Sequence, residues 1–242
     1  MTELPAKAQG KWRKVGKSAL ITGASSGLGR ELAILFSQDG HVILSGRNEK
    51  GLQETRALCK DPNNTTTVCG DLRDIGVIQR LVHFSDLYAI RYLICCAGQY
   101  KLDSFMNHSQ KIISDILNSN LVSTISLIRA VYPHLLDENS TIVHINSIAG
   151  KSVASSELVY AASKHGMKAF MQGLRYEVRP RGVRVLDVFP GAIQTPMCEG
   201  LPGYADMIIA KEAAKTIHTC ATMPFASMQI DELHIGRFTP KN

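Results

Sequence analysis

The residues most suited to chemistry in this sequence are a tyrosine and a lysine four positions apart, Tyr160 and Lys164. On a regular helix such side chains share one face, with Cβ atoms about 5–6 Å apart. A free phenol has a pKa of about 10 and holds its proton too tightly to act as a base near neutral pH. A neighbouring ammonium group favours the phenolate. The pair therefore predicts a phenol that exchanges a proton near neutrality, although an exposed aromatic–aliphatic contact gives the same spacing.

Ser147 precedes Tyr160 by thirteen residues, at the end of an apolar run and before the turn at 148–150. A hydroxyl there can donate a hydrogen bond to a substrate oxygen and stabilise the charge that develops on it. The alternative is a hydrogen bond within the turn itself.

A glycine-rich loop follows the apolar run 18–22 and carries Gly23, Gly27 and Gly29. Glycines let the backbone turn tightly and approach a ligand, and the N-terminus of the next helix offers free N–H groups to phosphate. The spacing Gly-x-x-x-Gly-x-Gly differs from the common dinucleotide fingerprint. A tight turn needed only for packing is the alternative, but a strand before the loop and a helix after it favour dinucleotide binding.

These residues need a scaffold, and the rest of the chain alternates short apolar runs with helical patterns. Strands are expected at 18–22, 41–45, 66–69, 92–96, 141–145, 183–188 and 228–235. Helices are expected after Gly29 and at 48–59, 74–84, 112–136, 158–178 and 210–220. Such alternation predicts right-handed βαβ units and a parallel sheet with helices on both faces. Ligands then bind beyond the carboxyl ends of the strands.

Composition places few further limits on the molecule. The 242 residues are 45% hydrophobic and 20% charged, which is ordinary for a globular protein. Part of the net charge of +6 lies in residues 1–16, interpreted as a flexible basic arm before one domain at 17–242. Contact of the arm with nucleic acid, a membrane or an anionic cofactor is the alternative. The main interpretation assigns the protein no nucleic-acid partner.

The sequence also favours a cytoplasmic protein. No apolar run reaches 18 residues, so no membrane span is expected, and the N-terminus has no apolar secretion signal. The six cysteines show no disulfide framework, which is typical of a reducing compartment. No pairing of histidines or carboxylates indicates a metal site.

Taken together, the motifs of Gly23–Gly29 and Tyr160–Lys164 resemble the short-chain dehydrogenase/reductase family, over about residues 17–236. The resemblance implies a single α/β domain of the Rossmann type, doubly wound, with a seven-stranded parallel sheet in the order 3-2-1-4-5-6-7 flanked by helices. It also implies hydride transfer between a nicotinamide cofactor and a carbonyl or secondary alcohol. A non-catalytic NADP(H)-sensing regulator or scaffold is the alternative, and a nucleotide-sugar epimerase or dehydratase is a third.

The resemblance assigns roles to individual residues. It makes Ser147, Tyr160, Lys164 and Asn120 catalytic, with Lys164 also on the nicotinamide ribose and Asn120 holding a relay water at a helix irregularity. Asn118 is the alternative for Asn120 if the register shifts. The cofactor-binding residues it implies are Gly23, Ser25, Ser26, Gly27, Leu28, Gly29, Arg47, Asp71, Leu72, Ala97, Gly98, Tyr160, Lys164, Pro190, Gly191, Ile193 and Thr195.

The end of the second strand indicates which cofactor is used. Gly46 stands where NAD-using relatives carry an aspartate that binds the ribose 2′-hydroxyl. Arg47 follows, and its guanidinium suits a phosphate. We therefore predict NADP(H); an exposed loop arginine without cofactor preference is the alternative.

Two more expectations concern the substrate and the sheet. The segment 195–210 is expected to be a small lid whose apolar residues favour a modestly hydrophobic carbonyl compound. Cys95-Cys96 replaces the family's Asn-Asn, and thiols cannot reproduce amide hydrogen bonds, so altered support of the sheet is expected. A reactive cysteine there is the alternative. The resemblance also implies a homodimer or homotetramer built on helices 112–136 and 158–178.

Overall fold

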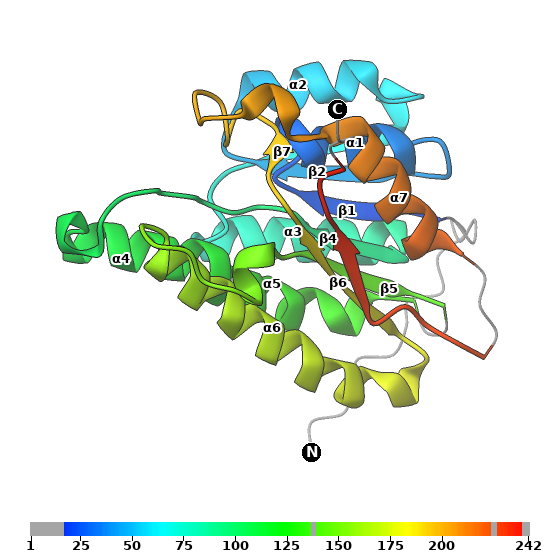
Figure 1. Cartoon of the computed structure of the whole chain (residues 1–242). Coiled ribbons are helices and arrows are strands. Elements are labelled where there is room, and N and C mark those ends of the chain that lie inside the picture. The colour runs from blue at the N-terminus through cyan, green and yellow to red at the C-terminus, as the bar shows by residue number, and fades with distance from the viewer. Residues whose placement is uncertain (1–16, 137–138, 224–226, 239–242) are drawn as a thin grey trace.

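A seven-stranded parallel sheet forms the centre of the molecule in the computed structural model (Figure 1), which describes residues 17–136, 139–223 and 227–238. The strand order is β3-β2-β1-β4-β5-β6-β9, the order that the family resemblance implied, with β9 as seventh strand. The strands are Ala19–Thr22 (β1), Val42–Gly46 (β2), Thr65–Cys69 (β3), Tyr92–Cys95 (β4), Thr141–Ile145 (β5), Arg184–Pro190 (β6) and Glu232–Ile235 (β9). The predicted basic arm, 1–16, lies outside the described residues.

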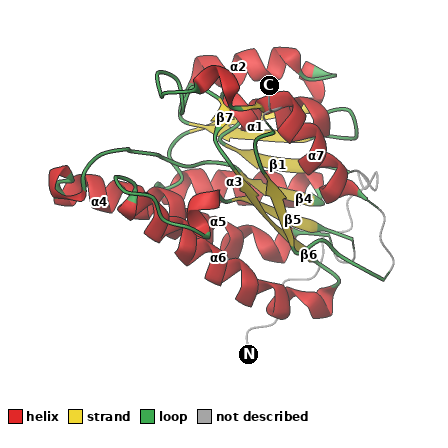
Figure 2. Ribbon diagram, viewed as in Figure 1, coloured by secondary structure: helices red, strands yellow, loops and turns green. Residues whose placement is uncertain are grey.

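Helices cover both faces of this sheet, as Figure 2 shows. On one face the core includes side chains of α1, α2 and α7, and on the other those of α3, α5 and α6. The helices are Gly27–Phe36 (α1), Glu49–Leu58 (α2), Ile75–Tyr88 (α3), Gln110–Leu117 (α4), Ser123–Val131 (α5), Leu158–Val178 (α6) and Ala210–Thr222 (α7).

Each central strand packs into both cores because successive side chains point to opposite faces. In β1, Ala19 and Ile21 belong to the core under α1, whereas Leu20 belongs to the core under α5 and α6. All three are fully buried. This two-sided burial explains why the strands read as continuous apolar runs in the sequence.

The helix predicted over 112–136 is interrupted. Between α4 and α5, residues Asn118–Val122 form a π-helical segment, and Tyr132–His134 form a final 3-10 turn. A π segment contains one extra residue per turn and commonly occurs at functional sites. Side-chain periodicity does not reveal so short a change, which is why the prediction ran through it.

Two short strands were absent from the sequence prediction. Ile193–Gln194 (β7) and Ile208–Ile209 (β8) pair in parallel and enclose the base of the predicted lid. The last strand is also shorter than predicted, because only 232–235 pair with β6. Two-residue strands show no alternation that a sequence pattern could detect.

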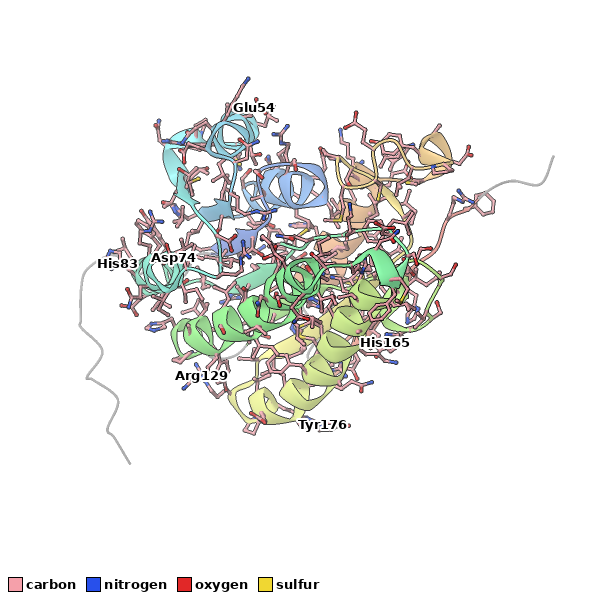
Figure 3. The ribbon with its side chains drawn as sticks, turned by 90° about the vertical axis from the view of Figure 1, so that its left-hand side faces the viewer. Glu54, Asp74, His83, Arg129, His165 and Tyr176 are labelled. Carbon is pink, nitrogen blue, oxygen red and sulfur yellow. The ribbon has the colours of Figure 1, made fainter. Side chains whose placement is uncertain are left out.

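Helices α5 and α6 lie side by side on one face of the molecule. Figure 3 shows this face with Arg129 on α5 and His165 and Tyr176 on α6. Tyr176 is 76% exposed. Among the residues described, no helix is long and apolar enough to cross a bilayer.

Candidate active site

A cavity of about 600 Å³ opens at the carboxyl ends of the strands. Its lining includes every residue for which the sequence predicted a catalytic or cofactor-binding role, except Asn120. The glycine loop and Arg47 contribute to it from the N-terminal half, and Ser147, Tyr160, Lys164 and Thr195 from the C-terminal half. The topology thus brings residues more than a hundred positions apart to one site.

The glycine loop is closed tightly against its neighbours. Gly23 and Gly27 have φ of +67° and +53°, a conformation that side chains rarely adopt. A Cβ on Gly29 would lie 2.2 Å from the Gly23 carbonyl oxygen, and one on Gly27 would lie 3.0 Å from Thr195. Only glycine fits here, so the backbone N–H groups that begin α1 remain accessible to a ligand.

Helix α6 presents Tyr160 and Lys164 on the face toward the sheet. The Lys164 ammonium donates a 2.8 Å hydrogen bond to the Ile145 carbonyl oxygen at the end of β5. It lies 5.7 Å from the centre of the Tyr160 ring. The predicted pairing on one helix face is therefore present.

The predicted effect of this pair on acidity is wrong for the structure. Burial raises the pKa of Tyr160 well above that of a free phenol, and the nearby Ser147 hydroxyl offsets only part of this change. Burial also lowers the pKa of Lys164 to about 8. Desolvation dominates because both groups face a largely enclosed site, and the ammonium is bound to a carbonyl instead of the phenol.

Ser147 ends β5 and starts a short 3-10 turn, Ile148–Gly150. Its hydroxyl oxygen accepts a 3.1 Å hydrogen bond from the Ala149 N–H. The turn bond considered as the alternative is thus formed. The hydroxyl hydrogen still remains available, because an acceptor role leaves the O–H donor free.

Asn120 lies in the π segment and is buried. Its amide exchanges two hydrogen bonds with the Gln99 backbone, of 2.7 and 2.8 Å, and donates a third to the Ser163 hydroxyl at 3.2 Å. Asn118 is exposed, so the structure favours Asn120 over the register alternative. The Asn120 side chain therefore connects the loop after β4 to helix α6 by hydrogen bonds.

At the opposite end of the cavity, the residues fit a dinucleotide. The Ser45 hydroxyl is buried, lines the cavity and has no hydrogen-bond partner within the described residues. The exposed Arg47 guanidinium lies at the rim. Asp71 binds Arg73 through both carboxylate oxygens, at 3.1 and 2.8 Å, and this contact lowers its pKa. A hydroxyl without partner beside a glycine cradle indicates a polar ligand.

The Thr22 hydroxyl supports the backbone that follows Cys95. Its oxygen accepts hydrogen bonds of 3.1 Å from the Cys96 and Ala97 N–H groups. It thereby joins β1 to the loop after β4, and the altered support expected from the two cysteines stays a prediction. Burial raises the pKa of both thiols to about 12, so neither is a reactive thiolate near neutral pH.

The sequence interpretation missed several polar residues of the cavity, among them Tyr100 and Glu157. The Tyr100 hydroxyl lies 3.4 Å from a Glu157 carboxylate oxygen, and its ring contacts that of Tyr160 edge-on at 4.9 Å. Glu157 precedes Tyr160 by three residues, a helical spacing that could have revealed it. Tyr100 could not be found this way, because its place depends on the loop path. Met197, Cys198 and Leu201 line the lid side.

No metal is implied by this arrangement. Within the described residues, no group of three or more His, Cys, Asp or Glu side chains is placed to hold a metal ion.

Comparison with known sequences identifies relatives of the whole domain. The pattern of the family described as short chain dehydrogenase matches residues 17–202. An uncharacterized oxidoreductase of Staphylococcus epidermidis is 29% identical, with 90% of this chain and 96% of the relative covered. A 3-oxoacyl-[acyl-carrier-protein] reductase FabG of Rickettsia conorii is 35% identical, with 77% and 76% covered. These relatives give no support to a non-catalytic regulator or scaffold.

Solved structures show the same fold. A short-chain dehydrogenase/reductase from Brucella melitensis, described as glucose/ribitol dehydrogenase, has a TM-score of 0.84 at 25% identity, covering 91% of this chain and 95% of that one. A short chain dehydrogenase from Burkholderia cenocepacia in complex with NADP has a TM-score of 0.81 at 24% identity, covering 91% and 96%. The chain is therefore an oxidoreductase of the short-chain dehydrogenase family.

Proposed function

We propose that this protein is an NADP(H)-dependent carbonyl reductase or secondary-alcohol dehydrogenase with Tyr160 as general acid/base. The observation that carries the proposal is the joint lining of one cavity by Ser147, Tyr160 and Lys164 at one end and by the glycine loop and Arg47 at the other. When bound, NADP(H) supplies or accepts the hydride.

The glycine loop and the rim of the cavity would hold the cofactor. The N–H groups that start α1 would hold its phosphates, and Thr195 and Ile193 would bind the nicotinamide. Ser45 and Arg47 would bind the ribose and its 2′-phosphate. Asp71, which is held by Arg73, would bind the adenine, as the family resemblance implies.

The catalytic residues then act on the substrate oxygen. Ser147 and Tyr160 donate hydrogen bonds to it and stabilise the charge that develops. The raised pKa of Tyr160 keeps the phenol protonated before the reaction. The negative charge that develops on the substrate oxygen would then draw this proton. Lys164 attracts the resulting phenolate, and Asn120 supports the path by which the proton is replaced.

The charge at the mouth of the cavity narrows the substrate class. Glu157 lies with Tyr100 beside Tyr160, among the apolar lid residues. A carboxylate there repels an anionic substrate and accepts hydrogen bonds from hydroxyl or amino groups. We therefore expect a modestly hydrophobic carbonyl compound that is neutral or cationic.

Reduction of a panel of carbonyl compounds tests the proposed reaction, with consumption of NADPH and of NADH recorded separately. Arg47→Leu is expected to weaken NADPH binding about 10–100-fold, since a phosphate contact is lost, and to leave NADH nearly unchanged. Lys50→Leu, an exposed cation on α2 outside the cavity, is the matched control. Equal effects on both cofactors would contradict the predicted preference.

Glu157→Gln tests the substrate class with pairs of ketones that differ only in a carboxylate or its methyl ester. The variant is expected to improve kcat/KM for the acid about 5–50-fold relative to the ester, because the repulsion is removed. Glu199→Gln, an exposed carboxylate on the lid outside the cavity, should leave the ratio unchanged. A ratio that does not change in Glu157→Gln rules out this selection.

We also propose a homodimer or homotetramer that uses the face of α4, α5 and α6. Apolar surface is exposed there by Val122 in the π segment between α4 and α5 and by Leu158 and Tyr176 on α6. Light scattering would then give two or four times the chain mass of 26.5 kDa. A monomer at micromolar concentration would contradict it.

A further inference from the structure

A buried polar network that the reaction does not use lies directly under the active centre. Its members are Asp187 on β6 and His144 and Asn146 at the end of β5, exposed by only 1%, 2% and 3%. Asp187 and His144 are direct cross-strand partners in the sheet. Their side chains project to the same face, toward α6 and Lys164.

Every oxygen of the Asp187 carboxylate has a donor. One oxygen accepts a 2.8 Å hydrogen bond from His144 Nδ1, and the other accepts a 2.9 Å bond from Asn146 Nδ2. The acceptor fixes the tautomer, because Nδ1 must carry the hydrogen that it donates. Burial lowers the pKa of His144, so its ring stays neutral near pH 7.

Asn146 connects the Asp187 carboxylate to the catalytic serine. Its amide oxygen accepts a 3.0 Å hydrogen bond from the Ser147 N–H. The turn packs closely against this amide, since a Cβ on Gly150 would lie 2.6 Å from that oxygen. Asp187, Asn146 and the Ser147 backbone thus form one connected chain.

The same carboxylate faces the catalytic lysine. Lys164 is bound to the Ile145 carbonyl between His144 and Asn146, and Asp187 acts on it as the principal favourable charge. The other titratable groups that face it are His144 from β5, Cys96 from the loop after β4 and Tyr160 from its own helix. The first is neutral and the other two hold their protons, so none of these described groups replaces the carboxylate.

We propose that Asp187 is a positioning residue of the active centre, which orients Ser147 through Asn146 and supplies a negative charge on the side of the sheet that Lys164 faces. The proposal rests on the proposed function only for its kinetic consequence. A purely structural role is a poor explanation of the network, since an apolar pair at a buried cross-strand position would be at least as stabilising as a buried carboxylate.

The charge on Lys164 can be tested without substrate or cofactor. In the full chain labelled with ¹³C at lysine Cε, the Lys164 signal, assigned through its loss in Lys164→Met, is followed by NMR from pH 6 to 10. Asp187→Asn is expected to lower the pKa of Lys164 by about one unit. Asp39→Asn, which removes the carboxylate 2.9 Å from His218 elsewhere in the fold, should leave it in place. An unchanged titration in Asp187→Asn would overturn the proposal.

Positioning is tested by an exchange of the two side chains. Asp187→Asn removes the charge and replaces one acceptor oxygen by an NH₂ group, so the amide accepts from only one of its two partners and the network must rearrange. The kcat is therefore expected to fall at least about tenfold. Adding Asn146→Asp restores each hydrogen bond, since the amide introduced at position 187 then donates to the carboxylate introduced at position 146. That carboxylate still accepts from the Ser147 N–H. The double variant should recover most of the lost kcat; an equally poor double variant would overturn the positioning role.

Two further measurements distinguish a folding failure and a failure of the proposed function from a failure of the positioning role. If Asp187→Asn does not fold, Asn146→Ala, which keeps the carboxylate and its histidine, carries the positioning test, and an undiminished kcat in it would overturn that role. If the wild-type protein reduces nothing in the carbonyl panel, the proposed function fails, whereas the NMR titration still decides whether Asp187 sets the charge of Lys164.

Discussion

Lys164 places an ammonium group in the interior of the protein, where only 4% of the residue is exposed. Burial lowers its pKa to about 8, and Asp187 is the main neighbour that opposes this change. A positive charge held so far from water is costly for the fold. Such a cost is expected where a group serves chemistry instead of stability.

The stability of the protein should therefore depend on this lysine in a pH-dependent way. Between pH 8 and 10.5 the unfolded chain binds a proton at Lys164 that the folded chain has lost, so stability from this group rises with pH. Lys164→Met removes the dependence. At pH 7 the Lys164→Met variant should have a higher free energy of unfolding than the wild type. This difference should shrink by an amount on the order of 3 kcal/mol between pH 7 and 10.5, because the wild type gains stability over this range.

Urea titrations of both proteins across this pH range give the measurement. A constant difference between wild type and Lys164→Met would show that Lys164 has the same pKa in the folded and unfolded chains.

At the scale of residues, the sequence predicted the catalytic side chains better than the side chains that hold them in place. Tyr160, Lys164 and Ser147 were recognisable because their types and spacing are set within one helix and one turn. Asp187 and Tyr100 were not, since each meets its partners only through strand register or the path of a loop. The direction of the Tyr160 pKa was wrong because burial is a tertiary property.

At the scale of elements, the boundaries of α6 were predicted correctly, at 158–178. The break between α4 and α5 was not visible, although the resemblance placed an irregularity at Asn120. The π segment brings Asn120 onto the Gln99 backbone, and this contact joins the loop after β4 to α6. One irregular turn thus connects two walls of the site.

The glycine loop makes a sharp prediction at this scale. Gly29→Ala should destabilise the protein by about 1–3 kcal/mol and abolish NADPH binding, because its Cβ would overlap the Gly23 carbonyl. Gly173→Ala is the contrasting variant, since Gly173 is exposed on α6 with open space around its Cβ position. It should stabilise the protein by about 0.5–1 kcal/mol.

Thermal melting and NADPH fluorescence titration compare the two substitutions. A Gly29→Ala protein that melts with the wild type and binds NADPH normally would mean that the loop is not packed as described.

At the scale of the whole molecule, the site is a product of topology. The glycine loop follows β1 and Ser147 follows β5, and β1 and β5 flank β4 in the sheet. All three strands end at the same edge because the sheet is parallel, which is why alternating apolar runs and helical patterns were enough to predict where the site lies. The pair β7–β8 and the lid path were not predictable, since they depend on contacts of two residues.

The central claim is that Tyr160 transfers the proton in a reaction that NADP(H) drives. The most direct test is the rate of NADPH consumption by Tyr160→Phe with a carbonyl substrate of the wild type, beside NADPH binding by both proteins. We expect normal folding, retained NADPH binding and a rate at least about 100–10,000-fold lower, because only the phenolic hydroxyl, which carries the transferred proton, is removed. A Tyr160→Phe protein that turns over at a near-normal rate would contradict the assignment of Tyr160 as the general acid/base.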